Sequence, residues 1–239
     1  INIRIVLNKM SKILASIKDL SEAKILIDTD IDIIDLKDPS KGALGRLEKN
    51  DIEIIVNFIN KKKLTSSTVG DLPNDIELIS ENVDEVSSTN VDFIKIGVYD
   101  NSYIKTLCNI KSCKKLIAVF FADKFLPTKN EIAELKESGF SGIMVDTSNK
   151  KSGNLFNHVT HYQINNFITI AKSMNLLTGI AGSINKTHID DIIKLNPNYM
   201  GFRGALCENN ASRSSNITAE NVNDIVKLVR NYKIISISA

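Results

Sequence analysis

The chain has 239 residues, a formal net charge of +2 and an apolar content of 43%. Its length fits one large domain or two small ones, and its apolar content is enough for a substantial buried core. The near-neutral charge, without a basic stripe interleaved with aromatic residues, argues against nucleic-acid binding. No apolar run reaches about 18 residues, so we expect no membrane span.

Short β-like runs alternate with amphipathic helical stretches along the chain. Strands are expected over 13–17, 31–37, 64–69, 91–98, 116–122, 142–146, 176–181 and 199–203. A helical stretch follows each strand, and four of these helices are expected to open on pairs with the spacing of a capping box: Asp19 with Glu22, Asn50 with Glu53, Asn74 with Glu77 and Thr128 with Glu131. Another helix is expected to begin at Thr187. Eight strand–helix units in a row favour a (β/α)₈ TIM barrel, a single α/β domain, over an open doubly wound sheet.

The folded domain is expected over 12–232, between an N-terminal extension (1–11) and a C-terminal tail (233–239). The first residues, INIRIVLNK, are too short and too polar for a signal peptide. Three cysteines make no disulfide framework, and their spacings match no zinc pattern. His158 and His161 have a spacing that allows metal chelation, but a catalytic metal site would also need a carboxylate or thiolate nearby. We expect a reduced cytoplasmic protein with no metal and no organic cofactor.

Asp35 and Lys37 share one face at the end of the second predicted strand, because side chains alternate along a strand. An acid and an amine so placed are costly if merely buried and useful if catalytic. A lysine in a dry, cationic site loses proton affinity, and the neutral amine can attack a carbonyl and form a Schiff base. The alternative is a structural Asp–Lys pair on the barrel rim.

Lys95 lies inside an apolar strand, between Ile94 and Ile96. If these branched residues face the outer helices, Lys95 faces the barrel interior, where a second ammonium near Lys37 favours the neutral form of one amine. The opposite register, with Lys95 snorkelling outward, would bury Phe93 and Gly97 against the helices instead.

Further candidates lie at other strand ends, where barrel enzymes place their chemistry. Asp146 ends the sixth strand and Lys150 follows in the next loop, while Ser66, Thr68 and Asp71 lie at the end of the third strand and could line the same mouth. The fold often binds phosphate after strands seven and eight. Glycine turns allow a close backbone approach to a ligand, so the expected phosphate site consists of Gly182, Ser183, Arg203 and Gly204.

Seven ordered motifs between about residues 12 and 230 resemble the (5-formylfuran-3-yl)methyl phosphate synthase family of methanofuran biosynthesis. They are IIDLKDP at 33–39, GALG at 42–45, SSTVGDLP at 66–73, DFIKIGVY at 92–99, VDTSNK at 145–150, AGSI at 181–184 and GFRGALC at 201–207. The resemblance implies a TIM barrel that condenses two glyceraldehyde 3-phosphate molecules into a phosphorylated furan aldehyde. It implies that Lys37 forms the Schiff base, that Lys95 accepts a proton, and that Asp35, Asp146 and Lys150 complete the acid–base set.

The hypothesis is that an imine on Lys37 acts as an electron sink for phosphate elimination, and that the resulting enamine attacks the aldehyde of a second triose phosphate. Three alternatives stay open: a class I aldolase that stops at a linear product, a phosphate-binding decarboxylase barrel that uses the Asp-x-Lys pair without an imine, and a non-catalytic phosphosugar-binding barrel. Triose phosphates are the expected small-molecule partners, and a homo-oligomer is left open.

Overall fold

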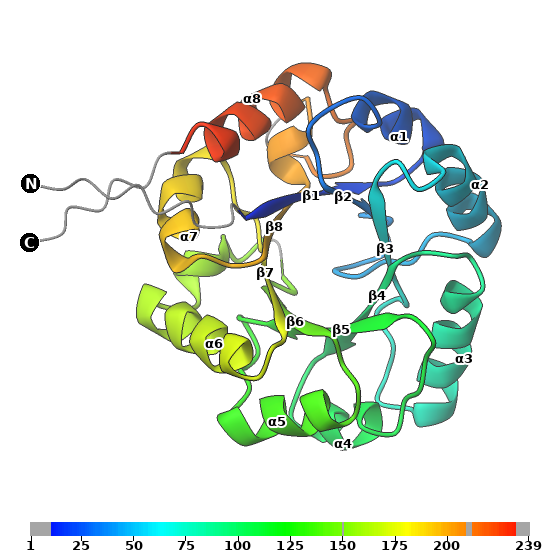
Figure 1. Ribbon diagram of the computed structural model, residues 1–239, viewed down its shortest axis with the longest axis vertical. Helices are drawn as coiled ribbons and strands as arrows, with labels where there is room; N and C mark the ends of the chain where they lie inside the picture. Colours follow the sequence, from blue (N-terminus) through cyan, green and yellow to red (C-terminus); the bar gives the residue numbers. More distant parts are fainter. Residues whose placement is uncertain (1–10, 150, 209–211, 233–239) are drawn as a thin grey trace, which may run out of the picture.

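A computed structural model describes residues 11–149, 151–208 and 212–232, and within them eight parallel strands close into a barrel in sequence order (Figure 1). The predicted fold is confirmed. The predicted N-terminal extension (apart from Ser11), Lys150 and the C-terminal tail lie outside the described residues. The strands are β1 (Lys12–Ile17), β2 (Ile33–Leu36), β3 (Leu64–Thr68), β4 (Phe93–Val98), β5 (Lys115–Phe121), β6 (Gly142–Asp146), β7 (Leu177–Ile180) and β8 (Tyr199–Phe202).

Helices surround the barrel, one after each strand (Figure 1). The pair Thr128–Glu131 forms the predicted capping box, whereas at Asp19 only half of the predicted box is present, because the carboxylate of Glu22 is directed elsewhere. The caps predicted at Asn50 and Asn74 are wrong, because one helix begins after Glu48 without a side-chain cap and the next is capped by Asp75. The helices are α1 (Leu20–Leu26), α2 (Lys49–Ile59), α3 (Ile76–Ser87), α4 (Ser102–Leu107), α5 (Lys129–Glu137), α6 (His161–Ser173), α7 (Ile189–Leu195) and α8 (Ala219–Arg230).

Short 3₁₀ turns precede three of these helices, at Leu155–Asn157, Lys186–His188 and Gly204–Leu206. The helix predicted to begin at Thr187 therefore starts as a 3₁₀ turn and becomes α-helical at Ile189. No described helix is long and apolar enough to cross a bilayer. The three cysteines are unpaired thiols.

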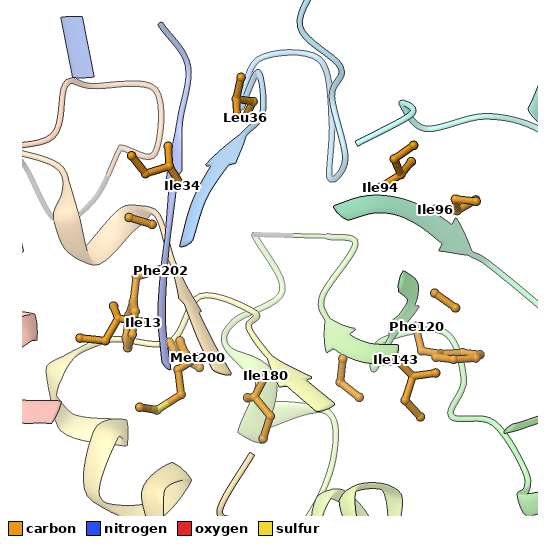
Figure 2. Close-up of a cluster of buried hydrophobic side chains, with 14 of the residues drawn as sticks. Ile13, Ile34, Leu36, Ile94, Ile96, Phe120, Ile143, Ile180, Met200 and Phe202 are labelled. Atoms are coloured by element: carbon orange, nitrogen blue, oxygen red, sulfur yellow. The ribbon is translucent and has the colours of Figure 1, made fainter. Parts of the chain in front are cut away.

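The main hydrophobic core lies between the barrel and the helices. Alternate strand residues point outward into it, among them Ile94, Ile96 and Phe120 (Figure 2). Because the outward positions of β4 are aliphatic, its other face, which carries Lys95, points into the barrel. The orientation that the strand pattern predicted for Lys95 is thus confirmed.

The barrel interior is apolar in part and polar where the site lies. A smaller core inside the barrel includes Leu14, Ile117, Val119 and Met144. Beside these residues the interior also holds buried charged side chains, which are costly unless they are paired. Their pairing defines the candidate site.

Candidate active site

A cavity of about 760 Å³ lies at the C-terminal ends of the strands, where TIM barrels carry their chemistry. Lys37, Lys95 and Asp146 all line it. The two lysines therefore face one shared space, as the alternation along β2 and β4 predicted. A volume in the range of about 300–1,000 Å³ is typical of sites for small organic ligands.

Asp35 is held by three donors inside the barrel. Its register neighbours on β1 and β3 are Ser16 and Ser66, whose hydroxyls donate to the two carboxylate oxygens over 2.8 and 2.6 Å. The ammonium nitrogen of Lys95 lies 2.6 Å from the Oδ1 atom. Burial alone would raise the pKa of Asp35, but the charges of Lys95 and Lys37 and the hydrogen bonds outweigh burial and hold this pKa below its usual value.

The lowered pKa of Asp35 predicts how stability changes with pH. Because the folded-state pKa lies below the unfolded value of about 3.9, the contribution of Asp35 is present above that value and is lost as pH falls through the folded-state pKa. In acid titrations of the free energy of unfolding, the wild type should lose more stability between neutral pH and pH values of about 3 than Asp35→Asn does. Equal losses in the two proteins would contradict the assignment of an ionised Asp35.

Lys37 lies across the cavity from a different carboxylate. Its Nζ atom is 3.9 Å from Oδ2 of Asp146, and both side chains are nearly inaccessible to solvent. The backbone N–H of Thr147 donates to the other oxygen of Asp146 over 2.7 Å, which fixes the carboxylate at the strand end. The acid and amine that are adjacent in sequence, Asp35 and Lys37, are therefore each matched with a group from a different strand.

The loop that carries Lys150 is anchored by a residue that no local sequence motif indicated. Asp123, after β5, accepts hydrogen bonds from the backbone and hydroxyl of Ser148 and from the backbone of Asn149, over 2.6–2.8 Å. These three bonds fix the chain directly before position 150. The contact spans about 25 residues of sequence, which explains why local patterns did not indicate it.

The candidates at the end of β3 lie outside the described lining of this cavity. Thr68 is buried and donates to the carbonyl of Gly45, and Asp71 accepts from the backbone of Leu44 and from the hydroxyl of Tyr99. Both residues thus hold the loop between β2 and α2. Ser66 contacts Asp35 instead of the cavity mouth.

The two glycine turns predicted to bind phosphate both line the cavity. Gly182 has a φ of +107° and Ser183 a φ of +51°, so the chain after β7 turns through a conformation that favours glycine. Gly204 differs, because its φ is not in the left-handed region and a Cβ there would meet no atom within 4 Å. Neither strain nor packing accounts for glycine at position 204, whereas close approach of a ligand would.

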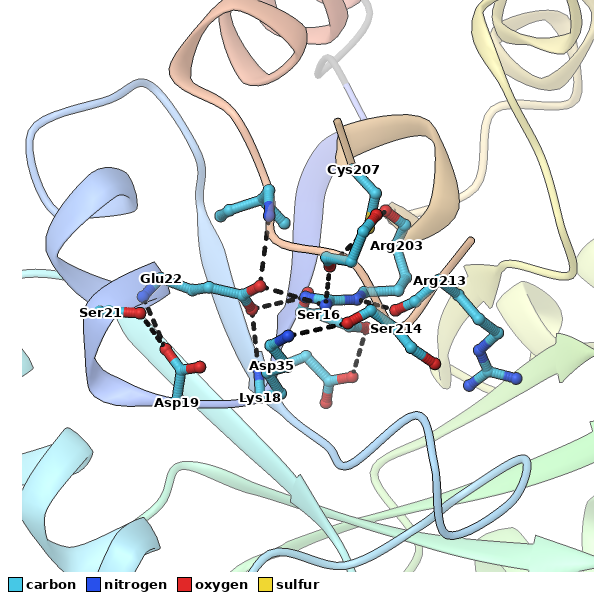
Figure 3. A network of polar contacts seen from close by, with 12 residues as sticks. Ser16, Lys18, Asp19, Ser21, Glu22, Asp35, Arg203, Cys207, Arg213 and Ser214 are labelled. Carbon is cyan, nitrogen blue, oxygen red and sulfur yellow. Dashed lines mark hydrogen bonds and ion pairs between the residues drawn. The ribbon is translucent and has the colours of Figure 1, made fainter. Parts of the chain in front are cut away.

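Arg203 forms a buried network in place of the direct phosphate contact that the sequence suggested. Its guanidinium makes two bonds to the carboxylate of Glu22, over 2.5 and 3.1 Å (Figure 3). Its other N–H groups donate to the carbonyls of Ser16, Arg213 and Ser215 over 3.1, 2.8 and 2.8 Å. All five N–H groups of the guanidinium are therefore occupied. Arg203 supports the cavity wall instead of offering a donor to a ligand.

A second cavity, of about 340 Å³, lies at the opposite end of the barrel from the first, at the N-terminal ends of the strands; it is called the lower cavity here, and the first the upper cavity. Leu14 and Lys95 line both cavities, so they separate the two spaces along the barrel axis. The lower cavity is mostly apolar, with Phe93 and Tyr199 among its walls. The upper cavity holds the paired charges and the glycine turns, and it is the candidate active site.

Solved structures with a similar fold include two barrel enzymes. 3-Hexulose-6-phosphate synthase from Salmonella typhimurium superposes with a TM-score of 0.59 and 17% identity over 92% of this chain and 99% of that one. Phosphoribosyl anthranilate isomerase from Thermus thermophilus gives a TM-score of 0.64 and 10% identity over 92% and 98%. At such identities the likeness concerns the fold alone.

Similarity in sequence gives more specific evidence of the family than similarity in fold. The (5-formylfuran-3-yl)methyl phosphate synthase of Methanococcus aeolicus is 31% identical over 90% of this chain and 98% of its own length. The enzyme of the same name from Archaeoglobus fulgidus is 30% identical over 91% and 99%. The family model of 4-HFC-P synthase matches residues 13–226, which span the whole barrel. The chain therefore belongs to the 4-HFC-P synthase family.

Proposed function

We propose that this protein condenses two triose phosphates into (5-formylfuran-3-yl)methyl phosphate through an imine on Lys37, as a step in making a methanofuran-type cofactor. The observation that carries the proposal is that Lys37 and Lys95 line one cavity, each beside its own buried carboxylate. An amine held in this way can capture a carbonyl once it has lost its proton. The described lining also holds more lysine and arginine side chains than carboxylates, which suits anionic substrates.

The reaction balances without a change in oxidation level. Two triose phosphates become one furan aldehyde phosphate, one free phosphate and two waters. One water leaves when the imine forms, and the other leaves when the ring closes. The bond between the Lys37 nitrogen and the ring carbon then breaks, and the released amine takes the proton that the neighbouring ring carbon loses as the furan becomes aromatic. The protein therefore has to supply proton transfers and charge stabilisation, which lysine and aspartate side chains can provide.

The product's substitution pattern indicates which carbons join. Its phosphomethyl group is on a ring carbon that is not next to the ring oxygen, so this carbon corresponds to the carbonyl carbon of the ketone triose, dihydroxyacetone phosphate. Attack of a Lys37 enamine on an aldehyde, as expected from the sequence, would place the phosphomethyl group beside the ring oxygen. We therefore assign to the Lys37 imine the role of electrophile.

The second triose remains an aldehyde and supplies the nucleophile. A base removes the proton next to its aldehyde, the carbon–oxygen bond to phosphate breaks with its electron pair on the phosphate, and the terminal carbon of the resulting enol attacks the imine carbon. Asp146 is the proposed base, because its carboxylate lies 3.9 Å from the Lys37 amine. Lys95, bound to Asp35, carries protons to the departing groups, and Lys150 joins this set by family resemblance.

The ketone triose keeps its phosphate, for which we propose the turns at Gly182, Ser183 and Gly204. The support for this placement is that all three residues line the cavity and that the glycine at position 204 leaves open space. Backbone N–H groups in such turns can bind phosphate oxygens without a charged side chain.

Incubation of the protein with glyceraldehyde 3-phosphate and dihydroxyacetone phosphate tests the proposal. The expected result is a conjugated aldehyde seen by ultraviolet absorbance, with the mass of the furan phosphate and one free phosphate released per product. A linear product without phosphate release would indicate an aldolase, and unchanged substrates despite binding would indicate a binding protein. Either result would overturn the proposal. Activity without an imine would leave the product assignment standing and remove the role of Lys37.

A further inference from the structure

Two phosphorylated substrates in one cavity require two anion sites, and the glycine turns account for one of them. The described lining of the cavity includes a second arginine, Arg213, on the loop between β8 and α8. Its side chain is half-buried, and its one hydrogen bond to the described residues runs from Nη2 to the carbonyl of Gly42 over 3.4 Å. Among the residues that the structure describes, no carboxylate lies within ion-pair distance of this guanidinium.

The backbone that carries Arg213 is fixed. Arg203 donates to the carbonyls of Arg213 and Ser215, and the ammonium of Lys18 donates to the carbonyl of Ser214 over 2.8 Å. The backbone carbonyls of three consecutive residues, 213 to 215, therefore each accept a hydrogen bond from a charged side chain. In Figure 3 the side chain of Arg213 extends away from the Arg203–Glu22 pair. Residues 213–215 therefore present one guanidinium to the cavity from a backbone that is held by hydrogen bonds.

The guanidinium of Arg213 contacts a loop other than the glycine turns. It donates to the carbonyl of Gly42, which lies in the loop that follows β2 and Lys37. Arg213 therefore lines the cavity on the side of that loop. Partial burial lowers the pKa of Arg213, while the carboxylates of Asp146 and Asp71 act in the opposite direction, so the group lies within electrostatic range of both. A partly buried guanidinium with unused donors binds phosphate oxygens in pairs.

We propose that Arg213 binds the phosphate of the second, aldehyde triose, which is the phosphate that leaves. This inference rests on the proposed function. The guanidinium would place the aldehyde triose beside the imine on Lys37 and would offset the charge that develops on the phosphate as the carbon–oxygen bond breaks. The proton lost from the carbon beside the aldehyde goes to Asp146, and the electron pair of the broken bond goes to the phosphate. Arg213 also makes the site selective for a phosphorylated second substrate.

The test measures the use of each substrate with a separate readout. Dihydroxyacetone phosphate alone, with borohydride, reports capture of the first triose on Lys37, and furan formation with varied glyceraldehyde 3-phosphate reports use of the second. In Arg213→Ala, trapping should be unchanged, while kcat/KM for glyceraldehyde 3-phosphate should fall about 10- to 100-fold, the effect of one charged hydrogen-bonding group. Arg213→Lys should restore part of this loss, and Arg213→Gln should not.

Lys41→Ala is the matched control. It removes one positive charge from the loop next to Gly42, but the ammonium of Lys41 is turned toward Glu48 and is not part of the described cavity lining. It should leave both readouts unchanged. Thermal melting of each Arg213 variant should match the wild type, because the side chain makes a single, long hydrogen bond with the part of the chain that the structure describes.

Each outcome decides between defined alternatives. Wild-type protein that makes no furan contradicts the proposed function itself. Wild-type protein that makes furan, with Arg213→Ala showing the same kcat/KM, overturns the role of Arg213 and leaves the proposed function intact. Loss of borohydride trapping with dihydroxyacetone phosphate in Arg213→Ala would assign the arginine to the first phosphate and would also overturn this inference.

Discussion

Lys37→Ala is expected to abolish furan formation and the borohydride-stable adduct together. The amine of Lys37 is the group proposed to form the covalent imine, and a methyl side chain cannot replace it. Loss of a residue that makes a covalent intermediate lowers kcat by at least about 10³-fold, since the remaining groups act only as part of the same unit. Peptide mass after reduction with substrate should locate the wild-type adduct on the peptide that contains Lys37.

Two further variants make this expectation specific. Lys37→Arg keeps a positive charge beside Asp146 but forms no imine, because guanidinium does not deprotonate in proteins, so it should be as inactive as the alanine variant. Lys95→Ala removes the partner of Asp35 and should slow turnover while the adduct stays on Lys37. An adduct on Lys95, or one that persists in Lys37→Ala, would contradict the assignment.

The strand pattern predicted the fold and the direction in which Lys95 points. The reason is physical: alternation on a parallel strand is set by burial, and the branched residues Ile94 and Ile96 bury more apolar surface against the helices than Phe93 and Gly97 would in the opposite register. The same alternation placed Asp35 and Lys37 on one inner face. Both inferences depended on local sequence alone.

The pairing of the charged groups was not predictable from local sequence. Asp35 is matched with Lys95, two strands away, and Lys37 with Asp146, four strands away. Such contacts depend on the stagger between strands and on how far each side chain reaches across the barrel. Neither is encoded in the residues beside Lys37. A sequence pattern thus identified the groups of the site, while the closed barrel determined their partners.

Glu22 is the clearest case in which tertiary structure overrides a local signal. Asp19 and Glu22 have the spacing of a capping box, and Asp19 does cap α1. The carboxylate of Glu22 instead accepts from Arg203, 181 residues away, and from the backbone N–H groups of Lys18 and Ile217. The spacing of the box shows only that Glu22 lies near a helix start, and a buried, charged guanidinium is a stronger partner for its carboxylate than a neutral backbone N–H.

Glu22→Ala is expected to be among the most destabilising single substitutions in the chain. It leaves the buried guanidinium of Arg203 without its counter-charge, and removal of one partner of a buried ion pair typically costs about 3–5 kcal/mol. For a domain of this size the melting temperature should fall by roughly 6–20 °C. Scanning calorimetry of the purified variant measures it. Lys194→Ala, which breaks an exposed pair with Asp191, is the control and should melt close to the wild type.

A double substitution tests why the chain retains the buried pair of Glu22 and Arg203. Replacing both partners, as in Glu22→Leu with Arg203→Met, removes both buried charges and should recover part of the lost stability, although the backbone N–H groups of Lys18 and Ile217 still lose their carboxylate acceptor. The double variant should not recover kcat/KM for glyceraldehyde 3-phosphate, because the guanidinium that binds the backbone carbonyl of Arg213 is gone. The melting temperature would then partly recover while the use of the second substrate stays impaired. If Glu22→Ala melts within a degree or two of the wild type, or if the double variant regains full activity, the network is not what positions this loop.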